Sequence, residues 1–152
     1  MLLLLKNIRR KNREKNVMIQ LNVECPHCKH SLLDETNKID GYPSVHILFE
    51  FKGKKDELYL SSLYGSDNSK IPSFVSEGDT LILFCPWCKA SLMSTRICEK
   101  CNAQMVLMDI EDGGNIQICS RKGCKKHFLE FEDLGTELKA FYNVYSTFFK
   151  GD

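Results

Sequence analysis

Apolar and polar residues alternate in several short segments of the chain, a pattern that predicts β-strands. Nearly every second residue from Val45 to Phe51 is apolar, which is the period of a strand with one buried face. Further runs at 57–63 and 80–84 extend this segment to a meander of about three strands. Shorter apolar runs predict three more strands, at 105–110, 115–118 and 128–131.

Turn residues and a change of period divide the rest of the chain. Residues 52–56, with Gly53, predict a turn, and a polar loop ends at residue 79. The Asp-Gly within 111–114 lies between two apolar runs and predicts a β-hairpin. Over 134–152 apolar residues recur every three or four positions, which predicts an amphipathic α-helix with an aromatic-rich stripe. The expected fold class is mainly β with a C-terminal helix.

The eight cysteines of the chain fall into four close pairs, which points to metal binding. The pairs are Cys25/Cys28, Cys85/Cys88, Cys98/Cys101 and Cys119/Cys124. Eight thiolates supply two tetrahedral four-sulfur sites and leave no cysteine over. We therefore expect two structural Zn²⁺ ions per chain, with all eight cysteines as metal ligands.

The first two pairs lie in an internal repeat. Residues 24–32 (ECPHCKHSL) and 84–92 (FCPWCKASL) are identical at six of nine positions. Proline after the first cysteine fixes its own φ and favours a tight turn whose amides point at the bound sulfur. The repeat favours one metal shared by these two pairs. In the alternative pairing, the cysteines within 85–101 form one site and Cys25/Cys28 meet Cys119/Cys124.

The last two pairs form the most specific pattern, Cys98-x2-Cys101-x17-Cys119-x4-Cys124, in which two knuckles bracket the predicted hairpin. Over residues 95–131 this pattern resembles the zinc-ribbon (rubredoxin-like) fold group, which implies a metal-held β module. The segment from Cys25 to Cys88 resembles an enlarged ribbon with a longer strand insert. We therefore expect two zinc ribbons in tandem. The expected divisions are 1–17 (a disordered basic arm or a non-native extension), 18–94 (enlarged ribbon), 95–133 (second ribbon) and 134–152 (helix).

Other sulfur chemistries fit parts of the pattern. Rubredoxins bind iron with four cysteines on this scaffold, and Phe84 and Trp87 offer an aromatic shell for electron transfer. The motif at 25–28 also resembles the active site of periplasmic thiol oxidases of thioredoxin fold, but no βαβ pattern surrounds it. His27 and His127 could replace a cysteine as ligand, although the cysteines already fill both sites.

Charge is distributed unevenly along the chain. Residues 1–17 hold six Lys or Arg against one Glu, and the remainder holds fifteen bases against nineteen acids. Two four-thiolate zinc sites, each of charge about −2, make that remainder still more acidic and a poor general binder of nucleic acid. One local basic cluster could contact phosphates or compensate the negative metal centre beside it. It comprises Arg121, Lys122, Lys125 and Lys126.

The sequence predicts a binding protein rather than an enzyme. It shows no nucleophile with an adjacent base, no paired acids and no phosphate loop, so we expect no small-molecule substrate. Trp87, Tyr145 and Phe148 are the candidate partner-binding residues. We expect an interaction module or accessory subunit that binds a protein partner or self-associates. Nucleic-acid binding by the basic cluster and rubredoxin-like electron transfer by iron are the alternatives.

The predicted location is the cytoplasm. The opening Met-Leu-Leu-Leu-Leu is too short for a membrane span or a signal-peptide apolar region. Paired cysteines that bind metal are typical of compartments where thiols stay reduced. No membrane association is expected.

Overall fold

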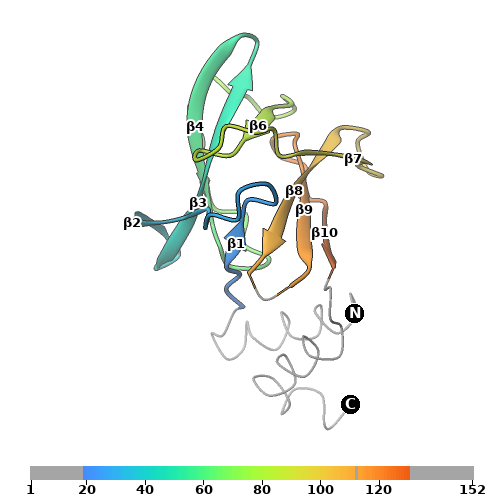
Figure 1. Ribbon diagram of the computed structural model, residues 1–152. Helices are drawn as coiled ribbons and strands as arrows, with labels where there is room; N and C mark the ends of the chain where they lie inside the picture. The colour runs from blue at the N-terminus through green and yellow to red at the C-terminus, as the bar shows by residue number, and fades with distance from the viewer. Residues whose placement is uncertain (1–18, 112, 131–152) are drawn as a thin grey trace, which may run out of the picture.

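The computed structural model describes residues 19–111 and 113–130, which form an antiparallel β protein (Figure 1). Within these residues there are ten strands and no α-helix. In chain order the strands are β1 (Val23–Glu24), β2 (Leu33–Ile39), β3 (Tyr42–Phe51), β4 (Lys54–Leu60), β5 (Ser69–Lys70), β6 (Ile82–Phe84), β7 (Met93–Ile97), β8 (Gln104–Ile110), β9 (Asn115–Cys119) and β10 (His127–Glu130). The mainly β class is confirmed. The predicted arm at 1–17 and the predicted helix at 134–152 lie outside the described residues.

The strands form two five-stranded sheets. The first sheet has the order β2-β3-β4-β5, and β6 also pairs with β3. The second sheet has the order β1-β8-β9-β10, and β7 also pairs with β8. Each sheet is therefore built on one strand, β3 or β8, that has one partner along one edge and two partners along the other.

The apolar alternation predicted for β3 is confirmed by burial. Val45, Ile47 and Phe49 are at most 4% exposed. Alternate residues of β8 belong to the same apolar core, among them Val106 and Met108. Because each sheet has only one strongly apolar face, burying the two faces in a common core removes both from water.

The chain crosses between the two sheets twice. β1 of the second sheet is followed by residues 25–32 and then by β2 of the first sheet. β6 of the first sheet is followed by residues 85–92 and then by β7 of the second sheet. Both crossings pass through the repeated sequence. Strand pairing thus joins residues on both sides of the predicted boundary at 94/95, and the division into two ribbon units stays a prediction.

The turn after β3 is shorter than predicted. Phe51 pairs with Lys54, so only Lys52 and Gly53 connect the strands. Their φ angles of 51° and 78° are both positive, the geometry of two-residue hairpin turns that match the twist of the strands. The turn predicted over 52–56 was too long, because the polar residues after Gly53 still pair with β3.

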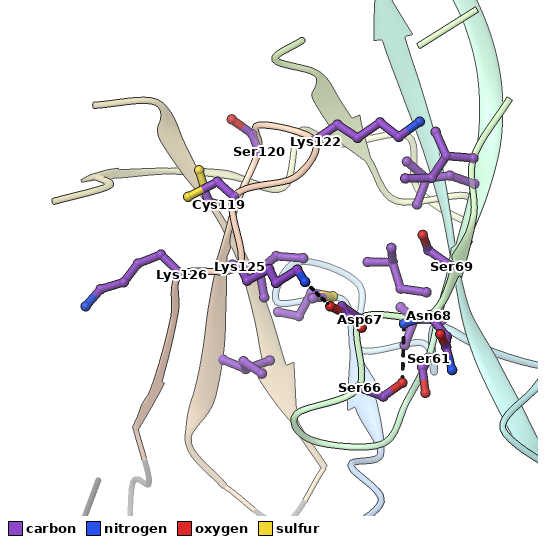
Figure 2. Close-up of a pocket in the computed structure, with 18 of the residues that line it drawn as sticks. Ser61, Ser66, Asp67, Asn68, Ser69, Cys119, Ser120, Lys122, Lys125 and Lys126 are labelled. Carbon is purple, nitrogen blue, oxygen red and sulfur yellow. Dashed lines mark hydrogen bonds and ion pairs between the residues drawn. The ribbon is translucent and has the colours of Figure 1, made fainter. Parts of the chain in front are cut away.

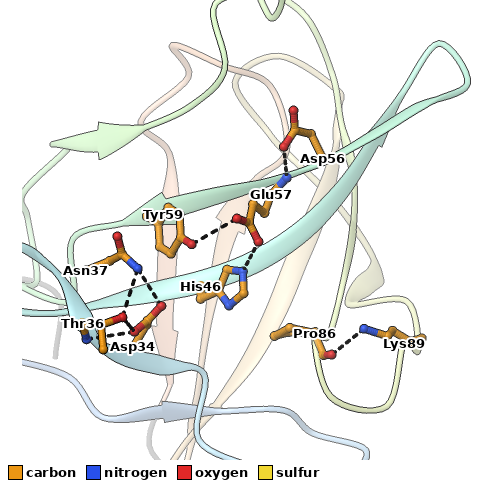
Figure 3. A network of polar contacts seen from close by, with 9 residues as sticks. All are labelled: Asp34, Thr36, Asn37, His46, Asp56, Glu57, Tyr59, Pro86 and Lys89. Carbon is orange, nitrogen blue, oxygen red and sulfur yellow. Dashed lines mark hydrogen bonds and ion pairs between the residues drawn. The ribbon is translucent and has the colours of Figure 1, made fainter.

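β2 was not among the predicted strands, because polar residues fill most of its length. Its pairing with β3 is interrupted by a register shift between Asp34 and Lys38. At this point the Asp34 carboxylate accepts hydrogen bonds from the amide and hydroxyl of Thr36, at 2.9 and 2.7 Å, and from Nδ2 of Asn37 at 2.9 Å (Figure 3). These bonds lower the pKa of Asp34 to about 2. Local polar contacts, more than apolar burial, shape this strand.

A second polar network lies where β3 and β4 pair. Nε2 of His46 is 2.9 Å from Oε2 of Glu57, and the hydroxyl of Tyr59 donates to the other oxygen at 3.3 Å (Figure 3). The His46 and Tyr59 rings stack with centroids 4.9 Å apart, and these residues are directly opposite each other. Such cross-strand pairs stabilise the register of the two strands.

Asp40 connects the turn between β2 and β3 to the loop after β4. Its carboxylate accepts hydrogen bonds from the hydroxyls of Ser61 and Ser66, at 2.6 and 2.7 Å, and from Nδ2 of Asn68 at 2.7 Å. These bonds lower the pKa of Asp40. Asp40 also has a φ of 59°, which Asp and Asn tolerate better than most residues.

We expect Asp40→Asn to lower the free energy of unfolding at pH 7 by about 1 kcal/mol, because the charge that strengthens the three hydrogen bonds is lost. The lowered folded-state pKa means that this contribution is present above the unfolded pKa of about 3.9 and lost as the pH falls through the folded value. The difference between variant and wild type should therefore be constant from about pH 6 to pH 8. Urea unfolding with excess zinc measures it.

Glu35→Gln on β2 is the matched control, since Glu35 is an exposed carboxylate of the same strand pair. We expect this variant to change the unfolding free energy by less than about 0.5 kcal/mol. An Asp40→Asn protein as stable as the control would contradict the role assigned to Asp40.

Candidate metal centres

The structure brings the eight cysteines together in two groups of four. Site I consists of Cys25, Cys28, Cys85 and Cys88, and site II consists of Cys98, Cys101, Cys119 and Cys124. Within each group all four sulfur atoms lie within 4.8 Å of one another, so each group could hold a metal ion. This grouping is the one that the internal repeat favoured, not the alternative that places the cysteines of 85–101 in one site.

Three of four sulfur–sulfur distances, two from each site, fit regular tetrahedral coordination of a metal ion, and the fourth is shorter. In site I the sulfurs of Cys25 and Cys88 are 3.8 Å apart, and those of Cys28 and Cys85 are 3.7 Å apart. The corresponding distances in site II are 3.8 and 3.3 Å. A regular tetrahedron with metal–sulfur bonds of about 2.3 Å places its sulfurs about 3.8 Å apart. All eight cysteines are free thiols, and this geometry suits zinc and iron alike.

The two repeat copies fold into nearly the same turn. In the first copy the amides of His27 and Cys28 donate to the sulfur of Cys25 at 3.3 and 3.5 Å. In the second copy the amides at the two equivalent positions donate to the sulfur of Cys85 at the same two distances. The prolines start these turns, and the amides stabilise negative charge on the sulfur.

Each knuckle of the Cys-x2-Cys type closes on a residue with positive φ. Lys29, Lys89 and Asn102, each directly after the second cysteine, have φ angles of 64°, 65° and 66°. Their amides donate to the carbonyl of the first cysteine at 2.9, 3.0 and 2.8 Å. The third knuckle thus has the backbone of the first two although it lacks their proline. Glycine enters this region without strain, whereas lysine does so at a cost in free energy.

The two copies of the repeat also hold each other by reciprocal contacts. Nε2 of His27 is 3.1 Å from the carbonyl oxygen of Ser91, and the indole N–H of Trp87 donates to the carbonyl of Ser31 at 3.2 Å. His27 and Trp87 occupy equivalent positions, as do the two serines. The ring of His30 stacks on Trp87 with centroids 4.9 Å apart. Sequence reasoning missed these contacts; the available signal was that the copies differ at 27/87 and 30/90, two of their three differences.

The two sites occupy different places in the fold. Cys25 follows β1 and Cys85 follows β6, so site I takes its ligands from both crossings between the sheets. Both residues are fully buried in the common core. Site II takes Cys98 from the end of β7 and Cys119 from the end of β9, and it is surrounded by a small apolar cluster of its own. Site I therefore joins the two sheets, and site II closes one end of the second sheet.

Burial and hydrogen bonding move the thiol pKa values in opposite directions. Burial raises the pKa of Cys85 to about 12 and also raises the pKa of Cys119. Hydrogen bonds from the amide of Ala103 and from Arg121 lower the pKa of Cys101 to about 6. A bound cation must therefore displace protons from the buried thiols.

Arg121, from the predicted basic cluster, belongs to the surroundings of site II. Its guanidinium donates to the carbonyl of Gly78 at 2.7 Å and to the carbonyl of Cys101 at 3.5 Å. The hydrogen bond and the charge of the Cys101 sulfur raise the pKa of Arg121. These contacts support the interpretation that this cation compensates the negative charge of a four-thiolate site.

The lysines of the basic cluster lie beside a cavity of 930 Å³ between the two sheets (Figure 2). Apolar side chains of both sheets line this cavity, together with residues 61–69. Nζ of Lys122 donates to the carbonyl of Val75 at 2.9 Å, and Nζ of Lys125 is 2.5 Å from Oδ2 of Asp67. Lys126 is exposed. The structure brings the four predicted cations near one another but directs three of them to protein oxygens.

The remaining predicted site residues are divided. Trp87 is described and exposed, whereas Tyr145, Phe148 and the side chain of His127 lie outside the described part.

Within residues 19–111 and 113–130 no helix has the length and hydropathy of a membrane span. Comparisons with protein-family models, curated proteins and solved structures found no match.

We expect the full-length protein to bind two zinc ions, and Cys85→Ser and Cys119→Ser each to bind one, because each variant removes one buried ligand from one site. Elemental analysis of the purified proteins measures this. Zinc thiolates are colourless, so visible absorption together with bound iron would identify the rubredoxin-like alternative. Two ions retained in both variants would contradict the assignment of these cysteines as ligands.

The positive φ of Lys89 gives a second expectation. In zinc-saturated protein Lys89→Gly should be more stable than Lys89→Ala by about 1 kcal/mol, because both remove the ammonium group but only glycine relieves the backbone strain. Lys55 on β4 is the control, since glycine weakens a strand and should be less stable than alanine there. Thermal unfolding of the four variants measures the sign of the glycine–alanine stability difference at each position. Equal stability of the two Lys89 variants would contradict strain at this knuckle.

Proposed function

We propose that the protein is a non-enzymatic β scaffold held by two structural Zn²⁺ ions, in sites I and II, that serves as a protein-interaction module. The observation that carries the proposal is the spacing of the sulfurs, which fits four-thiolate coordination of a metal ion. Zinc binding by small peptides contributes about 10–16 kcal/mol, as much as the whole stability of many domains. Binding of zinc and folding of the scaffold are then one process.

The composition of each site supports a structural role for the ion. Catalytic zinc sites keep one coordination position open for water or substrate, whereas four sulfurs fill a tetrahedral ion completely. In site I the two innermost ligands, Cys25 and Cys85, are also fully buried. Hydrogen bonds from knuckle amides fix the orientation of these two sulfurs and stabilise their negative charge. This arrangement favours stability over exchange of a substrate.

Trp87 supports the interaction role. At 63% its exposure exceeds that of the other exposed large hydrophobic residues in the described part of the chain, Tyr42, Ile82 and Ile97. Its ring stacks on His30 and its N–H binds the carbonyl of Ser31, so little side-chain freedom remains to be lost on binding. Exposed, pre-ordered tryptophans are typical of the centres of protein interfaces. The scaffold therefore presents Trp87 to a protein partner, with Tyr145 and Phe148 as further candidates.

Nucleic-acid binding by the basic cluster is the second candidate, and it has weaker support. Arg121 and Lys122 donate to backbone carbonyls and Lys125 pairs with Asp67, so phosphates would have to compete with these contacts. The excess of acids after residue 17 opposes a polyanion as well.

A pull-down with zinc-loaded full-length protein tests the proposal. We expect a specific protein partner or a second copy of the chain to bind, and Trp87→Ser to weaken that binding by at least about 30-fold, the effect of losing a central interface tryptophan. Tyr42→Ser, which truncates another exposed aromatic residue, is the control and should leave binding unchanged. Both variants should retain two zinc ions.

Two results would count against the interaction role. Equal binding by the Trp87→Ser and Tyr42→Ser proteins would remove Trp87 from the interface. A strictly monomeric protein without a partner that instead binds nucleic acid at low salt, and loses this binding in Lys125→Ala/Lys126→Ala, would establish the second candidate.

A further inference from the structure

The eight sulfur ligands are not equally protected from solvent. In site II every cysteine is buried or half-buried. In site I Cys25 and Cys85 are fully buried and Cys28 is half-buried, but Cys88 is exposed. Susceptibility of cysteine to oxidation follows thiolate character and access, and a metal-bound cysteine is a thiolate. Cys88 is therefore the ligand that a dissolved oxidant reaches first.

The asymmetry within site I has a cause in the repeat. His30, two residues after Cys28, stacks on Trp87 of the other copy. The equivalent pair on the opposite side is Ala90, two residues after Cys88, and His27. Alanine has no ring to place there. His30 thus has a ring partner in the other copy whereas Ala90 has none, and we attribute the greater exposure of Cys88 than of Cys28 to this difference.

We propose that Cys88 of the zinc-loaded protein is an oxidation site for hydroperoxides, and that its oxidation releases the zinc ion of site I through a disulfide with Cys25. The inference rests on the zinc binding proposed above. Cys25 is the partner that the geometry supports, because its sulfur lies 3.8 Å from that of Cys88. Cys25 is buried, so the exposed Cys88 reacts first and Cys25 second.

The reaction has two steps. The Cys88 thiolate attacks one oxygen of the hydroperoxide, the O–O bond breaks, and the alkoxide that leaves takes up a proton to give an alcohol. The Cys25 thiolate then attacks the sulfenic sulfur, an S–S bond forms, and the departing hydroxide takes up a proton to give water. The two thiolates lose two electrons and the hydroperoxide gains them. Only Cys28 and Cys85 then remain as thiolate ligands, too few to hold a zinc ion that needs four.

The position of site I in the fold determines the structural effect of losing its zinc ion. Its ligands come from both crossings between the sheets, so loss of the ion removes the metal link between them. Site II takes all its ligands from one end of the second sheet and contains no exposed cysteine. Oxidation thus acts on one site of the chain and spares the other.

The test uses zinc-loaded full-length protein treated with hydrogen peroxide in the presence of a chromogenic zinc chelator. We expect one of the two ions to be released at least about 10-fold faster than the other, since access differs between the sites. At the end of the fast phase, alkylation and peptide mass spectrometry should show Cys25 linked to Cys88 and the site II cysteines reduced. Equal release of both ions, earlier release from site II, or fast release with Cys88 unmodified would overturn the proposal.

Variants at the shielding positions test the cause. Ala90→His should slow the fast phase, because it adds a ring where His30 lies in the other copy, and His30→Ala should accelerate it by opening Cys28. Cys88→His keeps a zinc ligand that cannot form a sulfenic acid, so it should abolish the fast phase, whereas Cys124→His in site II should leave it unchanged. Unaltered release in Ala90→His and His30→Ala would contradict the shielding argument.

The measurements also distinguish failure of this proposal from failure of the proposed zinc binding. If wild-type protein contains no zinc before peroxide is added, the proposed structural zinc sites are wrong. If it contains two ions and releases them together, the zinc scaffold stands and the oxidation site is wrong. If Cys88→His fails to bind two ions, peptide mapping of wild-type protein and the rates at positions 30 and 90 still decide the question.

Discussion

Four sulfurs from two distant segments meet at site I, and much of the remaining architecture follows from this convergence. Cys25 and Cys85 can share one ion only if both crossings between the sheets lie against each other. When they do, β1 and β7 are delivered to the same edge of β8, and β2 and β6 to the same edge of β3. The two apolar faces are then brought into a common core. The knuckles are thus the points at which the chain is divided between the sheets.

The cysteine spacing and the hydrophobic period carried most of what could be inferred without coordinates. The repeat around Cys25 and Cys85 predicted their shared site because equal local sequence forms equal turns, and the structure repeats even the amide–sulfur distances. The alternation from Val45 to Phe51 predicted β3, and the Asp-Gly turn predicted the β8–β9 hairpin. In each instance a strong local preference agrees with the global fold.

Features set by residues far apart in the sequence could not be predicted from local patterns. β1 and β7 are short and have no marked alternation, and they exist as strands because β8 offers them an edge. β2 is mostly polar and is shaped by contacts of the Asp34 carboxylate. The roles of Arg121 and Trp87 also became clear only from their neighbours, because whether a cation or an indole faces solvent is set by tertiary packing.

The pairing of Val23 in β1 with Ile110 in β8 has a consequence for how the chain folds while it is being synthesised. Synthesis on the ribosome proceeds from the N-terminus, so β1 and the first knuckle emerge long before the strand and the knuckle that complete them. The first sheet, apart from β6, can assemble early from hairpins, whereas the second must wait for nearly the whole described chain. Such long-range closure is intrinsically slow. During that interval the first knuckle lacks the second cysteine pair of site I. Whether its two thiols stay reduced then depends on the reducing power and the metal supply of their surroundings.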